Sequence, residues 1–251
     1  MIDRGIGRMD YKLIAVCLCA ALLAGFIHGA LGMGFGMLAM AATTLFIPYN
    51  NAAAIVSVAL LVLVIQMSVS LRDSIRWREI RVPAAALLVG KILGIMLMMR
   101  LQSNWLRIAL GLFLILYSSA QLMNIRKLQI SGTPLQSVIF CGLGGFFGGM
   151  FNVSGPAASI YCQARYGSDP RSYAGNMNAI FLPSAVVAVL MHISYGNFSS
   201  SAVVGSVAMA LGVVFATAAG VSVLKRIRAE NMRKLSYLFI IVMGVIICIS
   251  G

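Results

Sequence analysis

A glycine-rich stretch at 142–161 lies between two long apolar runs, and it limits the possible folds more than any other part of the chain. Each glycine in a helix interior costs about 1 kcal/mol relative to alanine, and Pro156 removes a backbone donor. An uninterrupted helix is therefore not expected here. If the flanks cross a membrane, such irregular backbone is tolerated only where it is buried in protein or lines a water-filled cavity. The stretch is a candidate site on these grounds.

The composition indicates an integral membrane protein. Of the 251 residues, 61% are hydrophobic and 10% are charged, whereas a soluble domain carries about 25% charged residues. Long uncharged runs predict an all-α polytopic fold and exclude the alternating pattern of a transmembrane barrel. The net charge of +13 resides mainly in short segments between the runs, as the positive-inside rule requires. We therefore expect contact with a lipid bilayer and no binding of nucleic acid.

A second glycine-rich stretch, at 25–36, lies about 120 positions before the first. The two stretches can be set in register, and each is followed by a short apolar arm and a long apolar run. The register pairs Gly29 with Gly149, Gly32 with Asn152, Gly34 with Ser154, and Gly36 with Pro156. Two broken segments at corresponding places in two halves are the best sequence indication of a transporter binding site.

The order of these features predicts two tandem repeats, each a glycine-broken helical hairpin followed by three transmembrane helices. After an N-terminal tail at 1–11, repeat 1 covers 12–124 and repeat 2 covers 134–251, with a linker at 125–133. The hairpins are expected at 12–47 and 134–165, each with two short arms: 12–28 and 36–47, then 134–148 and 156–165. The six spans are expected at 51–71, 82–99, 104–123, 172–192, 198–224 and 235–250.

The orientation of the two halves follows from counting membrane crossings. A hairpin that turns back near mid-membrane leaves three crossings in each half, which makes the repeats inverted. This arrangement places most of the 19 Lys and Arg residues on one side of the membrane, in agreement with the positive-inside rule. The basic N-terminus fits it less well. If the first arm crosses completely, strict inversion is lost.

Charged groups are almost absent from the expected spans. All six acidic residues fall in the N-terminal tail or in loops, which disfavours a cation as substrate. Lys91 is the one charged residue expected at membrane depth, where a lysine costs about 2.5–3.5 kcal/mol. It can either snorkel to an interface or face a watered cavity and attract an anion.

The helix breaks supply groups that suit a small oxyanion. A half-helix that begins at Gly36 or Pro156 points unpaired N–H groups and a positive dipole end at the break. Asn176 and Asn178 either line the same cavity or hold helices together, and the same alternatives apply to Ser57 and Gln66. The expected substrate-binding residues are Gly32, Gly34, Gly36, Lys91, Asn152, Ser154, Gly155, Pro156, Asn176 and Asn178.

Other reactive side chains are few. His28 and His192 can either change their protonation state during transport or serve a structural role. The five cysteines have no Cys-x-x-Cys spacing, and we expect no disulfide framework, metal site or cofactor.

At 29–36 and 149–156 the chain resembles the TauE/SafE family of membrane permeases, and the resemblance covers about 12–250. The run Asn152-Val153-Ser154-Gly155-Pro156 fits the second-half motif of that family. The first-half motif differs at Phe35, where the family usually has glycine, and at Ala41, where a proline often follows. The resemblance implies a multi-pass permease or exporter of the bacterial inner membrane for sulfite, an organosulfonate or a related small anion. It is compatible with coupling to protons or to the membrane potential, and with a homodimer.

Two other functions stay open. A non-transporting membrane scaffold or assembly factor is compatible with the low polarity outside the breaks. The context of Ser154 also resembles that of rhomboid intramembrane serine proteases, with His192 as the base. Against an enzyme, Gly34 occupies the matching position in the first half, which favours a paired binding site over a unique nucleophile.

Overall fold

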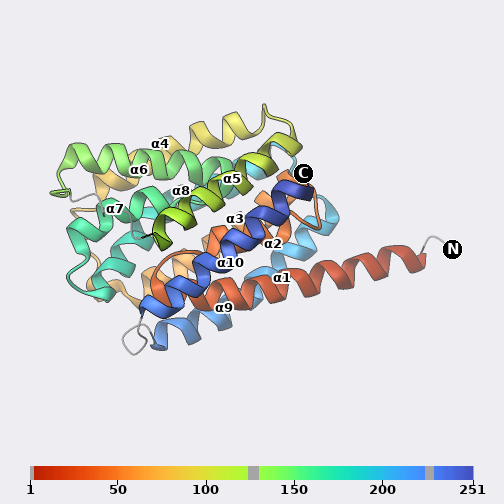
Figure 1. Ribbon diagram of the computed structural model, residues 1–251, viewed down its shortest axis with the longest axis horizontal. Helices are drawn as coiled ribbons and strands as arrows, with labels where there is room; N and C mark the ends of the chain where they lie inside the picture. The colour runs from red at the N-terminus through yellow and green to blue at the C-terminus, as the bar shows by residue number, and fades with distance from the viewer. Residues whose placement is uncertain (1–2, 124–129, 224–228, 251) are drawn as a thin grey trace.

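The computed structural model describes residues 3–123, 130–223 and 229–250, which form ten α-helices and one short 3-10 turn at Arg72–Ser74 (Figure 1). No strand occurs in these ranges. The helices are α1 (Asp3–Leu31), α2 (Phe35–Thr43), α3 (Tyr49–Ser70), α4 (Arg81–Met98), α5 (Ser103–Leu122), α6 (Pro134–Phe151), α7 (Gly155–Tyr166), α8 (Pro170–Ser194), α9 (Ser200–Val223) and α10 (Ala229–Ser250).

The predicted all-α polytopic membrane fold is confirmed. Seven described helices are long and apolar enough to cross a bilayer: α1 from Tyr11 onward, α3, α4, α5, α6, α8 and α9. The short helices α2 and α7 have 9 and 12 residues, or about 14 and 18 Å at 1.5 Å per residue. A hydrocarbon layer is about 30 Å thick, so neither short helix can cross it alone.

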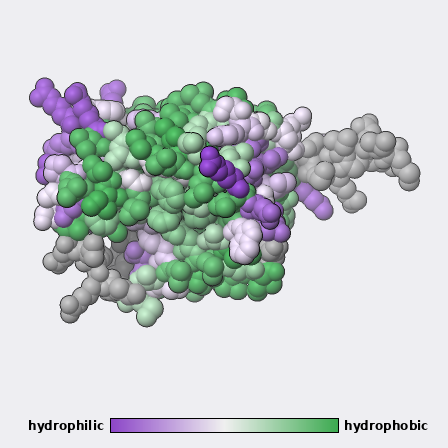
Figure 2. Space-filling view, turned by 90° about the horizontal axis from the view of Figure 1, so that it is seen from above, coloured by the Kyte–Doolittle hydropathy of each residue, from purple (hydrophilic) through white to green (hydrophobic). Residues whose placement is uncertain are grey.

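The surface agrees with a membrane location. Large apolar side chains are exposed along the outer helices, including Leu116 of α5, Leu190 of α8 and Phe215 of α9. In Figure 2 hydrophobic residues cover most of the face shown, and hydrophilic residues gather towards its two ends. A polytopic protein presents this distribution to lipid and to the two aqueous phases.

The first arm of each predicted hairpin is longer in the structure than the sequence suggested. Helix α1 already begins at Asp3, within the predicted tail, and α6 continues through its glycines to Phe151. The glycines do not break α6 because several of them allow α4 to approach. A Cβ on Gly145 or Gly149 would overlap the backbone of α4. This close packing offsets the weak helix propensity of glycine.

Two of the closest helix pairs each join a helix of the first predicted half to a helix of the second. Helix α1 packs along α9, and α6 packs along α4, in the two pairs at opposite edges of Figure 1. Gly29 lies against Gly220 in the first pair, as Gly149 lies against Gly94 in the second. Each pair runs parallel, because residue numbers rise together along both helices.

Two pairs of helices that the predicted repeats would place in corresponding positions, α3 with α8 and α5 with α10, run antiparallel. In the α3–α8 pair, Gly175 near the start of α8 lies beside Leu71 at the end of α3. In the α5–α10 pair, Gly111 lies beside Cys248, whereas the later Tyr117 stacks edge-on with the earlier Tyr237. Inverted repeats require this antiparallel geometry. The repeat boundaries stay a prediction, and most of the linker at 125–133 lies outside the described residues.

Candidate functional site

Two short helix interruptions carry the candidate site. Residues 32–34 join α1 to α2, and residues 152–154 join α6 to α7. Gly32 has a φ of 78° and Asn152 a φ of 56°, so both adopt the left-handed conformation that glycine and asparagine tolerate best. These two residues correspond in the sequence register. Their partners Gly34 (φ 115°) and Ser154 (φ −78°) also correspond but differ in conformation.

The two interruptions touch each other. A Cβ on Gly36 would overlap the carbonyl oxygen of Asn152, so only glycine permits this approach. Met33 also lies beside Gly155, with its Cβ 3.7 Å from the position that a Cβ on Gly155 would take. The breaks that the sequence places about 120 residues apart therefore form one region of the molecule.

Helix α3 of the first half holds the second break in place. The Asn152 side chain donates to the carbonyl of Ala53 (2.8 Å) and accepts from the hydroxyl of Ser57 (3.1 Å). The Tyr49 hydroxyl donates to the carbonyl of Met150 (2.7 Å), near the end of α6. These contacts satisfy backbone and side-chain groups that would otherwise be unpaired in the interior.

Helix α8 of the second half holds the first break in the same way. Asn178 donates to the carbonyls of Gly32 (3.4 Å) and Ala174 (2.9 Å). Its side-chain oxygen lies 3.0 Å from Nε2 of His28, and Nδ1 of His28 accepts from the backbone N–H of Phe35 (3.3 Å). A backbone amide can only donate, so the proton of neutral His28 resides on Nε2 and is donated to Asn178.

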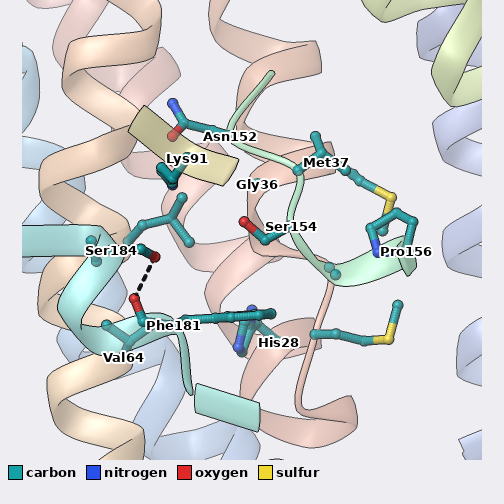
Figure 3. Close-up of a pocket in the computed structure, with 16 residues that line it drawn as sticks. His28, Gly36, Met37, Val64, Lys91, Asn152, Ser154, Pro156, Phe181 and Ser184 are labelled. Atoms are coloured by element: carbon teal, nitrogen blue, oxygen red, sulfur yellow. Dashed lines mark hydrogen bonds between the residues drawn. The ribbon is translucent and has the colours of Figure 1, made fainter. Parts of the chain in front are cut away.

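A small cavity lies between the two breaks (Figure 3). Its volume of about 30 Å³ exceeds the roughly 10–15 Å³ that one water molecule needs. An anion of several heavy atoms would have to widen it. The lining residues are His28, Met33, Gly34, Gly36, Met37, Leu60, Val64, Lys91, Asn152, Val153, Ser154, Gly155, Pro156, Phe181, Ser184 and Ala185.

The polar part of the lining favours negative charge. Lys91 is buried, with 4% of its surface exposed, and no described residue pairs with its ammonium group. Ser154 also lines the cavity (Figure 3). Its hydroxyl lies against Gly148 of α6 and has no hydrogen-bond partner among the described residues. The N-termini of α2 and α7 also reach the cavity through Gly36 and Gly155. Helix N-termini attract anions, and none of the described residues that line this space carries a carboxylate.

Seven of the ten residues predicted to bind substrate line this cavity: Gly34, Gly36, Lys91, Asn152, Ser154, Gly155 and Pro156. The location of Lys91 matches the cavity alternative and not snorkelling to an interface. The other three predicted residues lie elsewhere. Gly32 packs against Ala174, and Asn178 supports the first break. Asn176 bonds to the backbone of Ser74 and Arg76 in the loop before α4.

Sequence reasoning missed the apolar wall of the cavity. Leu60 and Val64 contribute one turn of α3, and Phe181 and Ala185 contribute one turn of α8. In each pair the residues are four apart and share a helix face. Nearly every neighbouring position in these helices is also apolar, so composition gives no contrast that would identify the inner face.

The structure does not join Ser154 to a histidine base. His192 is buried near the end of α8, where its Nδ1 lies 2.9 Å from the side-chain nitrogen of Asn197. It does not line the cavity that contains Ser154. His28 does line it, but the Phe35 amide occupies its Nδ1 lone pair. The hydrogen bond that activates a serine nucleophile is therefore absent from the described residues.

A comparison with protein families matches nearly the whole chain. The family model described as Sulfite exporter TauE/SafE matches residues 17–247, which is nearly the whole chain. No curated protein and no solved structure matches the chain closely enough to be counted.

Proposed function

Because the chain belongs to the TauE/SafE family of sulfite exporters, we propose that it carries a small anion, such as sulfite, an organosulfonate or a related sulfur oxyanion. The family consists of transporters and not of enzymes, and the chain is a multi-pass membrane protein. We place it in the bacterial inner membrane. The substrate binds where the two helix breaks meet.

The observation that carries this proposal is the buried, unpaired Lys91 in a cavity shared by two helix N-termini. An uncompensated charge at membrane depth is costly, so ionisable residues there usually have a partner or face water. No described carboxylate supplies that partner. A bound anion would neutralise Lys91 and accept hydrogen bonds from Ser154 and the free amides of α2 and α7.

Alternating access would open this site to one side of the membrane at a time. The reciprocal packing of α1 with α9 and of α6 with α4 supports two inverted halves that move against each other around a central site. The small volume of the cavity is consistent with a closed conformation, in which both paths to the site are shut.

Flux measurements on Lys91→Met test the proposal. We expect uptake of labelled sulfite into proteoliposomes to fall about tenfold or more, equivalent to about 1.4 kcal/mol of lost interaction. Lys12→Met makes the same substitution at an exposed lysine of α1 and should leave flux unchanged. Lys91→Arg keeps the charge and should retain part of the flux. Unchanged flux in Lys91→Met would exclude this site, and no sulfite flux in the wild type would favour a scaffold.

A further inference from the structure

His28 holds the N-terminus of α2, and the bond it makes there depends on its protonation state. The ring is buried, with 2% of its surface exposed, and it lines the same cavity as Lys91. Its Nδ1 accepts from Phe35, whose amide is the first of α2, while its Nε2–H donates to Asn178. A protonated imidazole has no acceptor, so protonation must break the bond to Phe35.

Among the residues whose side chains the structure describes, no acid lies near His28 to stabilise its cation. Helix α8 faces it with the neutral side chain of Asn178, and α2 faces it with backbone. At the neighbouring turns of α1, α9 contributes Thr217 and Gly220, which are also uncharged. Lys91 is the only charged group among the described residues that line the cavity, and it has the same sign as protonated His28. An empty cavity therefore favours neutral His28, and an anion would favour the cation.

We infer that His28 is the proton-coupling residue of the transporter, and that it takes up one proton when the anion binds and releases it when the anion leaves. The inference rests on the proposed function. The proton comes from water on the open side, bonds to Nδ1, and returns to water on the other side with the anion. Protonation also frees the Phe35 amide, which can then donate to the anion. Proton and anion consequently travel in the same direction.

The chain offers a direct spectroscopic test, because it contains only two histidines. His192→Gln leaves His28 as the single imidazole, and His192 does not line the cavity. Protein labelled with ¹⁵N-histidine and purified without a histidine tag gives nitrogen resonances for this one ring. Without sulfite we expect the neutral form with its proton on Nε2. Saturating sulfite at the same pH should convert the ring to the imidazolium.

Calorimetry measures the same proton as a stoichiometry. Sulfite titrations in two buffers of different ionisation enthalpy give the protons taken up per sulfite bound. Wild type and His192→Gln should each take up about one proton more than His28→Gln, which keeps a polar side chain but cannot titrate. The protonation of sulfite itself cancels in this difference.

The outcomes separate the two proposals. If sulfite binds while His28 stays neutral, or if His28→Gln takes up as many protons as the wild type, the coupling inference is wrong and the proposed transport stands. If sulfite does not bind the wild-type protein, the proposed function fails and the coupling inference fails with it. Conversion of His28 to the imidazolium when sulfite binds supports both the proposed anion transport and the role of His28 in proton coupling.

Discussion

Gly36 and Asn152 make a close contact where the two helix breaks meet. The carbonyl oxygen of Asn152 occupies the place of a side chain at Gly36, and the Asn152 side chain is bonded to α3 at the same time. In this conformation the contact holds the first break against the second break, which α3 holds in turn. The Asn152 side chain is 5% exposed and its hydrogen bonds are satisfied, so it acts as support as much as a potential ligand.

Gly36→Ala should destabilise the protein, because its Cβ would overlap backbone and not a flexible side chain. Overpacking of this kind costs about 1–3 kcal/mol. Gly155→Ala is the matched control, since the nearest atoms to its Cβ would be methionine atoms at 3.7–3.8 Å, an ordinary contact distance. Thermal unfolding in detergent should show a clear loss for Gly36→Ala and little change for Gly155→Ala. Equal melting temperatures for the two variants would contradict the contact.

At the scale of elements, the glycines of α6 have two different functions. Gly145 and Gly149 face α4, whereas Gly144 and Gly148 face the break and α7 near Ser154 and Ala158. Small residues on both sides let α6 approach two neighbours at backbone distance. This packing positions Lys91, because the α4 backbone around that residue is the surface against which Gly145 and Gly149 lie.

Gly145→Ala should loosen the α4–α6 pair. Its Cβ would overlap the carbonyl oxygen of Leu87 and lie 2.9 Å from the Lys91 amide, at an expected cost of about 1–3 kcal/mol. Gly142→Ala in the same helix has nothing nearer than an Ala86 oxygen at 3.9 Å, so it should be neutral or gain up to about 1 kcal/mol of helix propensity. Thermal unfolding of the two variants in detergent measures this difference in stability as a difference between their unfolding midpoints. Greater damage from Gly142→Ala would mean that α6 is rotated.

At the scale of the whole molecule, the sequence predicted the positions of the membrane spans better than the identity of the residues that line the cavity. The apolar runs separated by basic turns indicate most of the spans: α4 covers Arg81–Met98 where 82–99 was expected. The predicted register pairs Gly32 with Asn152, and both residues have a left-handed backbone conformation in the structure.

The breaks themselves are narrower than the glycine-rich stretches. A glycine that packs against another helix and a glycine that interrupts a helix look alike in a sequence, because only the neighbour decides between them. Asn176 and Asn178 illustrate the same limit, since a buried amide can serve either a substrate or a backbone. The apolar wall at Leu60 and Phe181 has no polar contrast to reveal it.

If the two halves move against each other during transport, locking the breaks together should stop it. Met33→Cys combined with Gly155→Cys places two Cβ atoms about 3.7 Å apart, within the 3.5–4.5 Å that a disulfide needs. Oxidation should lower sulfite flux of the double variant about tenfold or more, and reductant should restore it. Neither single variant should respond to the oxidant. Normal flux in the cross-linked protein would contradict movement of the two breaks against each other.

The most direct test of the anion site is to locate a bound anion. Selenite is the selenium counterpart of sulfite, and its anomalous scattering marks its position in crystals of the purified protein. We expect one strong peak between the N-termini of α2 and α7, within hydrogen-bonding distance of Lys91 and Ser154. That peak should be lost in Lys91→Met. A strong peak elsewhere, with this cavity empty, would contradict an anion site between the two helix breaks.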